Sequence, residues 1–182
     1  MRKLPGFGCA ALALVMGLSS LPHAAEAQCS ATGDGDSCTV PGSVSMTAGR
    51  VVRLQMGAGS TALTAPTTAD FDAGFNSTPG PTLTVSANAA WTLSLRSSAT
   101  FWAATNTSPG APARTTKPAE DLRWSTAANG TFLALTTSDA TLVSGAATAS
   151  SPTTLYFQTL YDWALDSPGN YSLTVVLTLT AP

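Results

Sequence analysis

The C-terminal stretch of this chain alternates apolar and polar residues more regularly than any other part of the sequence. A turn signal, Pro168-Gly169, precedes the alternation, which then continues to Thr180. The apolar positions are Tyr171, Leu173, Val175, Leu177 and Leu179, and the hydroxyl positions are Ser172, Thr174, Thr178 and Thr180. Because side chains on one face of a β-strand recur every second residue, this stretch predicts a half-buried strand entered through a turn.

The rest of the chain repeats this pattern in weaker form. Charged residues make up only 10% of the sequence, so the helix formers Glu and Lys are scarce, whereas Thr and Val, which favour strands, are common. Short apolar segments recur at intervals of about 8 to 12 residues, with turn residues between them, as in β-sandwiches. We therefore expect an all-β, Ig-like antiparallel β-sandwich that forms a single domain over residues 28–182.

Residues 1–27 have the features of a secretory signal peptide. Arg2 and Lys3 give a basic start, residues 6–21 are small and apolar, and Ala25-Glu26-Ala27 is an A-x-A cleavage site. The apolar run is shorter than the roughly 20 residues that a membrane span needs. We expect cleavage before Gln28 and a secreted, periplasmic or cell-surface protein without a membrane span.

The charge balance disfavours two classes of partner. The formal net charge is -2, and loss of Arg2, Lys3 and Glu26 with the signal peptide leaves a slightly more acidic chain without a cluster of Lys and Arg. Nucleic acids and anionic membranes are held by such clusters. We expect neither as a partner.

Cys29 and Cys38 are the only cysteines beyond the signal peptide. In an exported protein, two cysteines around a short polar loop predict a disulfide, which stabilises the fold by roughly 2 to 3 kcal/mol. A zinc site is the alternative, but two thiols alone make a poor zinc shell. The segment Asp34-Gly35-Asp36-Ser37 resembles part of a calcium loop that lacks its distal ligands. We expect no metal and no cofactor.

The segments at residues 83–87 and 91–95 predict a first hairpin. Both carry apolar side chains at odd positions, and the three residues between them would pair Ala87 with Trp91, Val85 with Leu93, and Leu83 with Leu95. All six side chains would then share one face.

A second hairpin is predicted around Asn129-Gly130, which is the preferred residue pair for a type I′ turn. A two-residue turn there would place Trp124 opposite Leu135 and Thr126 opposite Leu133. Leu122 would lie on the same face.

The remaining segments are less regular. Strands are expected at residues 43–47, 50–56, 140–144 and 155–163, the last with Leu155, Phe157, Thr159, Tyr161 and Trp163 on one side. Residues 61–79 are expected to be a long connection with at most one short strand, and residues 145–152 a small-residue loop. Residues 105–120, which contain three prolines, are expected to be an exposed loop and the most mobile region.

Sequence motifs for catalysis are lacking. The one histidine, His23, leaves with the signal peptide, which removes Ser-His-Asp and Cys-His catalysis. Carboxylates alone serve in glycosidases, and the available pairs are Asp70 with Asp72, Glu120 with Asp121, and Asp162 with Asp166. Each pair lies beside turn residues, so we interpret them as solvated acids that cap turns. We assign no catalytic residue and expect a protein that is not an enzyme.

The aromatic residues are the remaining candidates for a site. Trp91, Trp124 and Trp163 have aliphatic or aromatic neighbours on their faces, so we interpret them as core residues. Trp102 and Tyr156 form the candidate platform on which sugar rings would stack. Tyr171 follows a Pro-Gly corner, which predicts a tyrosine corner that ties its hydroxyl to the backbone.

Three features resemble bacterial surface and appendage domains. The ending PGNYSLTVVLTLTAP is similar to that of spore-coat-U-like and related fimbrial domains, in which a Pro-Gly-x-Tyr turn leads into the final strand. Within VSANAAWTLSL, Trp91-Thr92-Leu93 resembles the W-x-L motif of cell-wall-associated WxL domains, and Trp163-Ala164-Leu165 would be a second copy. With the secretory start, the resemblance implies an Ig-like sandwich outside the cytoplasm with a structural or adhesive role.

The expected function is that of an exported, non-enzymatic structural or adhesion-type domain of the cell surface or periplasm, with a surface protein or glycan as partner. A carbohydrate-binding module is the alternative. A pilin-like subunit that joins others through its edge strands is a third version. Because the residues before Cys38 are polar and glycine-rich, unlike a donor strand, we expect a monomer.

Overall fold

A computed structural model describes residues 30, 34, 37–40, 43–106 and 113–182. The chain divides into two compact units, Met1–Thr47 and Ala48–Pro182. Every helix and strand of the described residues belongs to the second unit.

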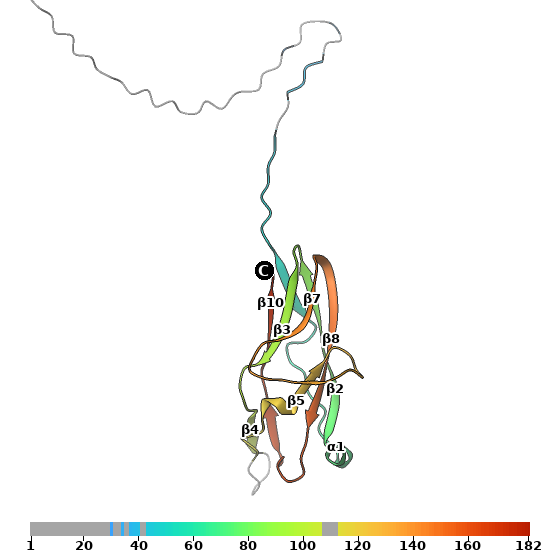
Figure 1. The fold of residues 1–182 in the computed structure, drawn as a ribbon, viewed down its shortest axis with the longest axis vertical. Coiled ribbons are helices and arrows are strands. Elements are labelled where there is room, and N and C mark those ends of the chain that lie inside the picture. Colours follow the sequence, from blue (N-terminus) through green and yellow to red (C-terminus); the bar gives the residue numbers. More distant parts are fainter. Residues whose placement is uncertain (1–29, 31–33, 35–36, 41–42, 107–112) are drawn as a thin grey trace, which may run out of the picture. The chain divides into compact units, whose positions relative to one another are not determined.

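The second unit consists mainly of antiparallel β-sheets (Figure 1). The larger sheet has the order β1 (Val52–Met56), β2 (Phe75–Ala87), β8 (Thr148–Leu160), β5 (Leu122–Ser125) and β6 (Leu133–Ala134). The smaller sheet has the order β10 (Val175–Thr180), β3 (Trp91–Ser97) and β7 (Ala140–Gly145). A two-stranded ribbon pairs β4 (Ala103–Asn106) with β9 (Gly169–Ser172).

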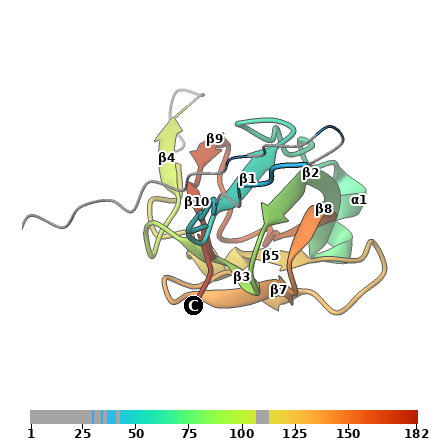
Figure 2. The same ribbon diagram turned by 90° about the horizontal axis from the view of Figure 1, so that it is seen from above.

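Among the described residues, helical structure is confined to two short segments, α1 (Thr68–Ala73) and the 3-10 turn η1 (Ala119–Asp121). The helices in the described part of the chain are too short or too polar to cross a membrane. Seen from above, α1 lies at the end of β2 and β8, away from β4 and β9 (Figure 2).

The core gathers alternate residues from both main sheets. Leu83 and Val85 of β2 and Leu93 and Leu95 of β3 are each at most 1% exposed, and Leu155 of β8 belongs to the same cluster. Each sheet therefore turns one apolar face inward, which is the two-layer arrangement of a sandwich. The prediction of an all-β, sandwich-like fold is confirmed.

β2 and β3 do not form the hairpin predicted for them. β2 pairs with β1 and β8, whereas β3 pairs with β10 and β7, so residues 88–90 cross from one sheet to the other. Val85 and Leu93 are nevertheless both buried, because inward side chains of two facing sheets share one core. The alternation correctly predicted the inward face, and the predicted partner strand was wrong.

The second hairpin contains the predicted strands in a different register. β5 and β6 pair Trp124 with Leu133 rather than with Leu135. The type I′ turn requires positive φ at Asn129 and Gly130, but in the described residues only Gly74 has a positive φ. The connection between β5 and β6 is therefore not a two-residue turn, and the partner of Trp124 lies two residues earlier in the sequence than predicted.

The final strand is divided at Leu173 and Thr174 into β9, which pairs with β4, and β10, which pairs with β3. Its predicted apolar face is confirmed, because all five side chains pack against the core: Tyr171, Leu173, Val175, Leu177 and Leu179. The division lets one apolar stretch serve two sheets.

Several predicted boundaries need correction. Residues 43–47 form no strand, and residues 61–79 contain α1 and the first part of β2 rather than a connection alone. β8 begins inside the predicted loop at residues 145–152 and ends at Leu160. Trp163 therefore lies beyond the strand whose inward face it was predicted to share, and it is 61% exposed.

Candidate functional site

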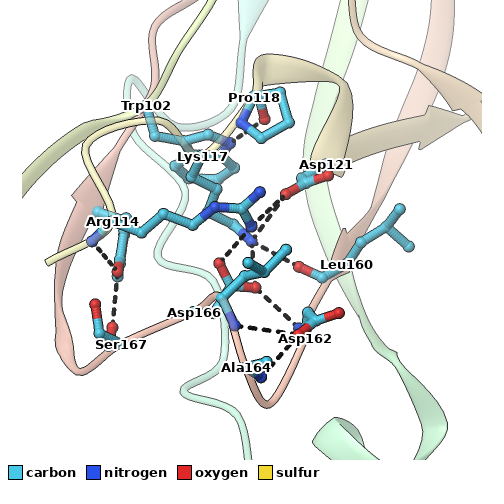
Figure 3. Close-up of polar contacts among 12 residues, drawn as sticks. Trp102, Arg114, Lys117, Pro118, Asp121, Leu160, Asp162, Ala164, Asp166 and Ser167 are labelled. Atoms are coloured by element: carbon cyan, nitrogen blue, oxygen red, sulfur yellow. Dashed lines mark hydrogen bonds and ion pairs between the residues drawn. The ribbon is translucent and has the colours of Figure 1, made fainter.

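The first candidate site is a buried charged cluster that comprises Arg114, Lys117, Asp121 and Asp166 (Figure 3). Lys117 is only 2% exposed, although lysine is rarely buried. Its ammonium group donates to the Asp166 carboxylate at 2.9 Å, to the Asp121 carboxylate at 3.2 Å and to the Leu160 carbonyl at 2.8 Å. The three donors of the ammonium group are thus all satisfied, as burial of a charge requires.

Arg114 balances the charge of the cluster. Its Nη1 lies 2.9 Å from Asp166 Oδ1 and 3.4 Å from Asp121 Oδ2. Two cations therefore face two anions, and each carboxylate contacts both cations. Loss of one member would leave a charge uncompensated in a buried position, which costs more than the intact pair contributes.

Asp166 has a perturbed pKa. Burial alone would raise the pKa of its carboxyl group, because a nonpolar surrounding disfavours the charged form. The hydrogen bonds from Lys117 and Arg114, the charge of Lys117 and the Asp162 N–H outweigh burial and hold the pKa of Asp166 below its ordinary value. The carboxylate therefore stays ionised in the folded chain at neutral pH.

Tyr171 joins the cluster to the backbone. Its hydroxyl donates to the Ser167 carbonyl at 2.7 Å and accepts from the Arg114 N–H at 3.0 Å. The first contact joins Tyr171 in β9 to the turn before that strand, four residues earlier. The second joins Tyr171 to the segment before η1. One side chain thus holds together two segments that are far apart in the sequence.

The geometry of the cluster favours a structural role over a catalytic one. A hollow of about 260 Å³ beside it is lined partly by Arg114, Asp121 and Asp166. Both carboxylates are occupied by the Lys117 ammonium group, so neither faces the hollow as an unpaired acid or base. The cluster binds the segment around η1 to the loop between β8 and β9.

The same contacts correct the prediction of an exposed loop at residues 105–120. Ala113, Lys117 and Ala119 are buried. Residues 107–112, the middle of that predicted loop, lie outside the described residues.

The carboxylate pairs are not all solvated turn caps. Asp70 caps α1 by accepting from the Thr67 N–H at 2.7 Å, and Asp162 accepts from the Ala164 N–H at 2.7 Å, as the interpretation required. Asp121 and Asp166 are instead ion-paired and largely buried. The cations that pair with Asp121 lie in its own segment, whereas those that pair with Asp166 arrive from another loop, of which its sequence neighbours gave no sign.

The predicted sugar platform of Trp102 and Tyr156 is wrong. Trp102 is only 6% exposed, and its indole N–H donates to the Pro118 carbonyl at 3.0 Å. Tyr156 is half-buried within β8. Trp102 therefore has no ring face for a ligand, because the turn at Pro118 covers it.

The predicted disulfide lies partly outside the described residues, which do not include Cys29. The segment that resembles a calcium loop does so too, because Gly35 and Asp36 are not described. Cys38 is not a free thiol, but its pairing with Cys29 stays a prediction. Within the ranges that the structure describes, His, Cys, Asp and Glu side chains do not gather in groups of three that could hold a metal ion.

The second candidate site is the edge strand β10. It has a single strand neighbour, β3, in the described part of the sheet. The inward residues Val175 and Leu177 are only half-buried, whereas Leu93 and Leu95 on β3 are fully buried. An edge strand of this kind leaves a row of backbone groups to which another strand can be added.

Residues 43–47 have the composition of such an added strand. Val44 and Met46 expose 100% and 88% of their surface, and Ser43, Ser45 and Thr47 alternate with them. Neither side chain packs against a core, so both are available to a partner. The alternation is typical of a β-strand, but residues 43–47 form no strand in the structure.

Comparison with protein-family models finds none that matches this chain, and comparison with curated proteins finds none either.

Proposed function

We propose that this chain is an exported, non-enzymatic structural subunit that joins neighbouring molecules by strand addition. In this account, residues 43–47 of one molecule add to β10 of another. The observation that carries the proposal is the joint presence of two exposed apolar residues, Val44 and Met46, at strand spacing and an edge strand with half-buried apolar residues.

The energetics of strand addition suit these residues. Burying the side chains of Val44 and Met46 contributes roughly 1.5 to 3 kcal/mol each. The added backbone pairs with the free groups of the edge strand, and the alternate side chains select the register. Both partners would then remove apolar surface from water, which neither molecule does alone.

β10 is one of several edge strands, and it is the one to which we assign the acceptor role. The apolar residues Val175, Leu177 and Leu179 of β10 pack on the core and remain half-buried. β1 also carries apolar residues, Val52, Leu54 and Met56, in alternation with Arg53 and Gln55. An added strand at β10 would cover aliphatic surface and extend the smaller sheet.

The proposal replaces the expectation of a monomer. That expectation rested on the polar residues before Cys38, whereas the apolar alternation lies after Cys38. Export is supported by the signal-peptide features of residues 1–27, and a structural role by the resemblance of the C-terminal stretch to fimbrial domains.

Two matched double variants test the proposal. Val44→Asp/Met46→Asp places charges on the face that would meet the acceptor, and Ser43→Asp/Ser45→Asp places them on the opposite face of the same segment. The molar mass of each purified protein is measured by light scattering after size exclusion at increasing concentration. The native chain and the serine variant should assemble, and the Val44/Met46 variant should remain monomeric with an unchanged melting temperature. A native chain that stays monomeric at every concentration overturns the proposal.

A further inference from the structure

An aromatic cluster lies beside α1, apart from the edge strand β10. It comprises Phe71 on α1 and Tyr161 and Trp163 in the segment after β8. The ring centroids of Phe71 and Trp163 are 4.6 Å apart at an interplanar angle of 31°, and those of Phe71 and Tyr161 are 5.3 Å apart. We call this group the aromatic platform.

Trp163 is held in one orientation within the aromatic platform. Phe71 packs against its ring, and its indole N–H donates to Asp72 Oδ1 at 3.1 Å. The residue is nevertheless 61% exposed. Phe71 covers part of the ring, and the larger part of the residue is open to solvent. A fixed and exposed indole face has little conformational freedom left to lose when a ligand stacks on it.

We propose that the aromatic platform binds a neutral glycan, with the open face of Trp163 stacked on the C–H face of a pyranose ring. An aromatic ring fixed in this way buries the apolar face of a sugar while the hydroxyl groups remain at the edge of the contact. The site is separate from the strand-addition surface, so either proposal can fail without the other.

One acceptor for sugar hydroxyls, Asp72, contacts the indole, and a second, Asp162, is the residue before Trp163. Asp72 holds the indole N–H through Oδ1, and Asp162 accepts from the Ala164 and Leu165 N–H groups through its own Oδ1. These contacts orient each carboxylate and leave its second oxygen without a hydrogen bond to the described residues. An oriented acceptor at the edge of a stacking face, such as Asp72, can fix the position of a sugar ring.

The local charge selects the class of glycan. Asp70 and Asp72 lie on α1, and Asp162 precedes Trp163. The cation near Tyr161, Lys117, is held in the buried charged cluster and is not available to balance them. Uronic or sialic acids would meet like charges at this surface, so the glycan should be uncharged.

Tryptophan fluorescence isolates this site. Trp91, Trp102 and Trp124 are at most 6% exposed, so acrylamide should quench mainly Trp163. The probes are soluble β-glucan, galactomannan and dextran as neutral polysaccharides, and polygalacturonate as the acidic one. Affinity electrophoresis through gels that contain each polymer measures retention of the full chain, and quenching measures protection of Trp163 by the same polymer.

The variants separate stacking from folding. Trp163→Ala should weaken retention by about tenfold, as expected for loss of an aromatic contact. Trp163→Phe keeps a ring and should retain part of the affinity, even if the alanine variant is less stable. Phe101→Ala removes another aromatic side chain, which is 50% exposed and lies outside the aromatic platform, and should change nothing.

We expect at least one neutral polymer to retard the native chain and to shield Trp163 from acrylamide. Retardation by none of the neutral polymers, retention of the Trp163→Ala variant equal to that of the native chain, or retention by polygalacturonate alone would each overturn the proposal.

Discussion

The ammonium group of Lys117 lies 2.9 Å from the carboxylate of Asp166, and neither side chain exposes more than 6% of its surface. The two residues are 49 positions apart in the sequence, one before η1 and the other between β8 and β9. Their contact, together with Arg114 and Tyr171, fixes the loops at this end of the sandwich. The stability of the fold therefore depends on a charged cluster as well as on the aliphatic core.

Replacement of Lys117 by methionine should destabilise the fold strongly. Met keeps most of the side-chain length but leaves the Asp166 carboxylate with Arg114 as its one cation, so we expect a loss of about 3 to 5 kcal/mol. Arg96→Met is the control, because Arg96 and Asp139 form an exposed pair at 3.7 Å, and such pairs contribute less than about 1 kcal/mol. Urea unfolding measures both, and equal losses would contradict a special role for the cluster.

The lowered pKa of Asp166 predicts acid sensitivity. An unfolded aspartate has a pKa of about 3.9, so below this value the unfolded chain binds a proton that the folded chain resists. The stability from Asp166 is present above about pH 4 and is lost as the pH falls toward the lower pKa of the folded state. Asp70, whose pKa the hydrogen bonds from Thr67 lower, acts in the same direction.

Asp166→Asn removes one of these two contributions. Denaturant unfolding between neutral and acid pH should show a smaller fall in stability for the variant than for the native chain. An identical pH dependence of the two proteins would show that the ion pairs of Asp166 do not stabilise its charged form.

Tyr171→Phe tests the hydroxyl that joins two segments. The change removes the donor to Ser167 and the acceptor for the Arg114 N–H, so we expect a loss of roughly 1 to 3 kcal/mol. Tyr156→Phe is matched in chemistry but removes a hydroxyl for which no hydrogen bond is found within the described residues, and it should lose little. Thermal unfolding of both variants decides between a bonded corner and an ordinary packed ring.

Gly74→Ala should destabilise the end of α1. Gly74 follows the helix with a φ of 78°, which costs a residue with a side chain about 1 to 2 kcal/mol. Gly59→Ala is the control, since a methyl group there has no neighbour within 4 Å and the glycine has no positive φ. A Gly59 variant as unstable as the Gly74 variant would contradict this explanation.

Alternation in the sequence predicted which side chains enter the core, but not which strands pair. Val85 and Leu93 both face inward, yet they lie in opposite sheets, because a period of two specifies a face and leaves the partner strand open. Trp163 shows the limit of the pattern. The alternation continues in the sequence as far as Trp163, but β8 ends at Leu160, and the residue is exposed.

The charged cluster was missed for a similar reason. Lys117 is the one lysine beyond residue 3, and Asp121 follows four positions later, which is the signal that the sequence offered. Asp166 comes from a distant loop, and nothing in its own segment indicates a buried cation. Contacts between irregular segments depend on the tertiary fold, so local patterns do not predict them.

Amide hydrogen exchange on the full chain, followed by mass spectrometry as the protein concentration rises, tests strand addition most directly. The account predicts that residues 43–47 and the amides of β10 become protected together and that the Val44→Asp/Met46→Asp variant gains no such protection. Exchange at residues 43–47 that stays fast at every concentration, or protection that appears without any change at β10, would contradict it.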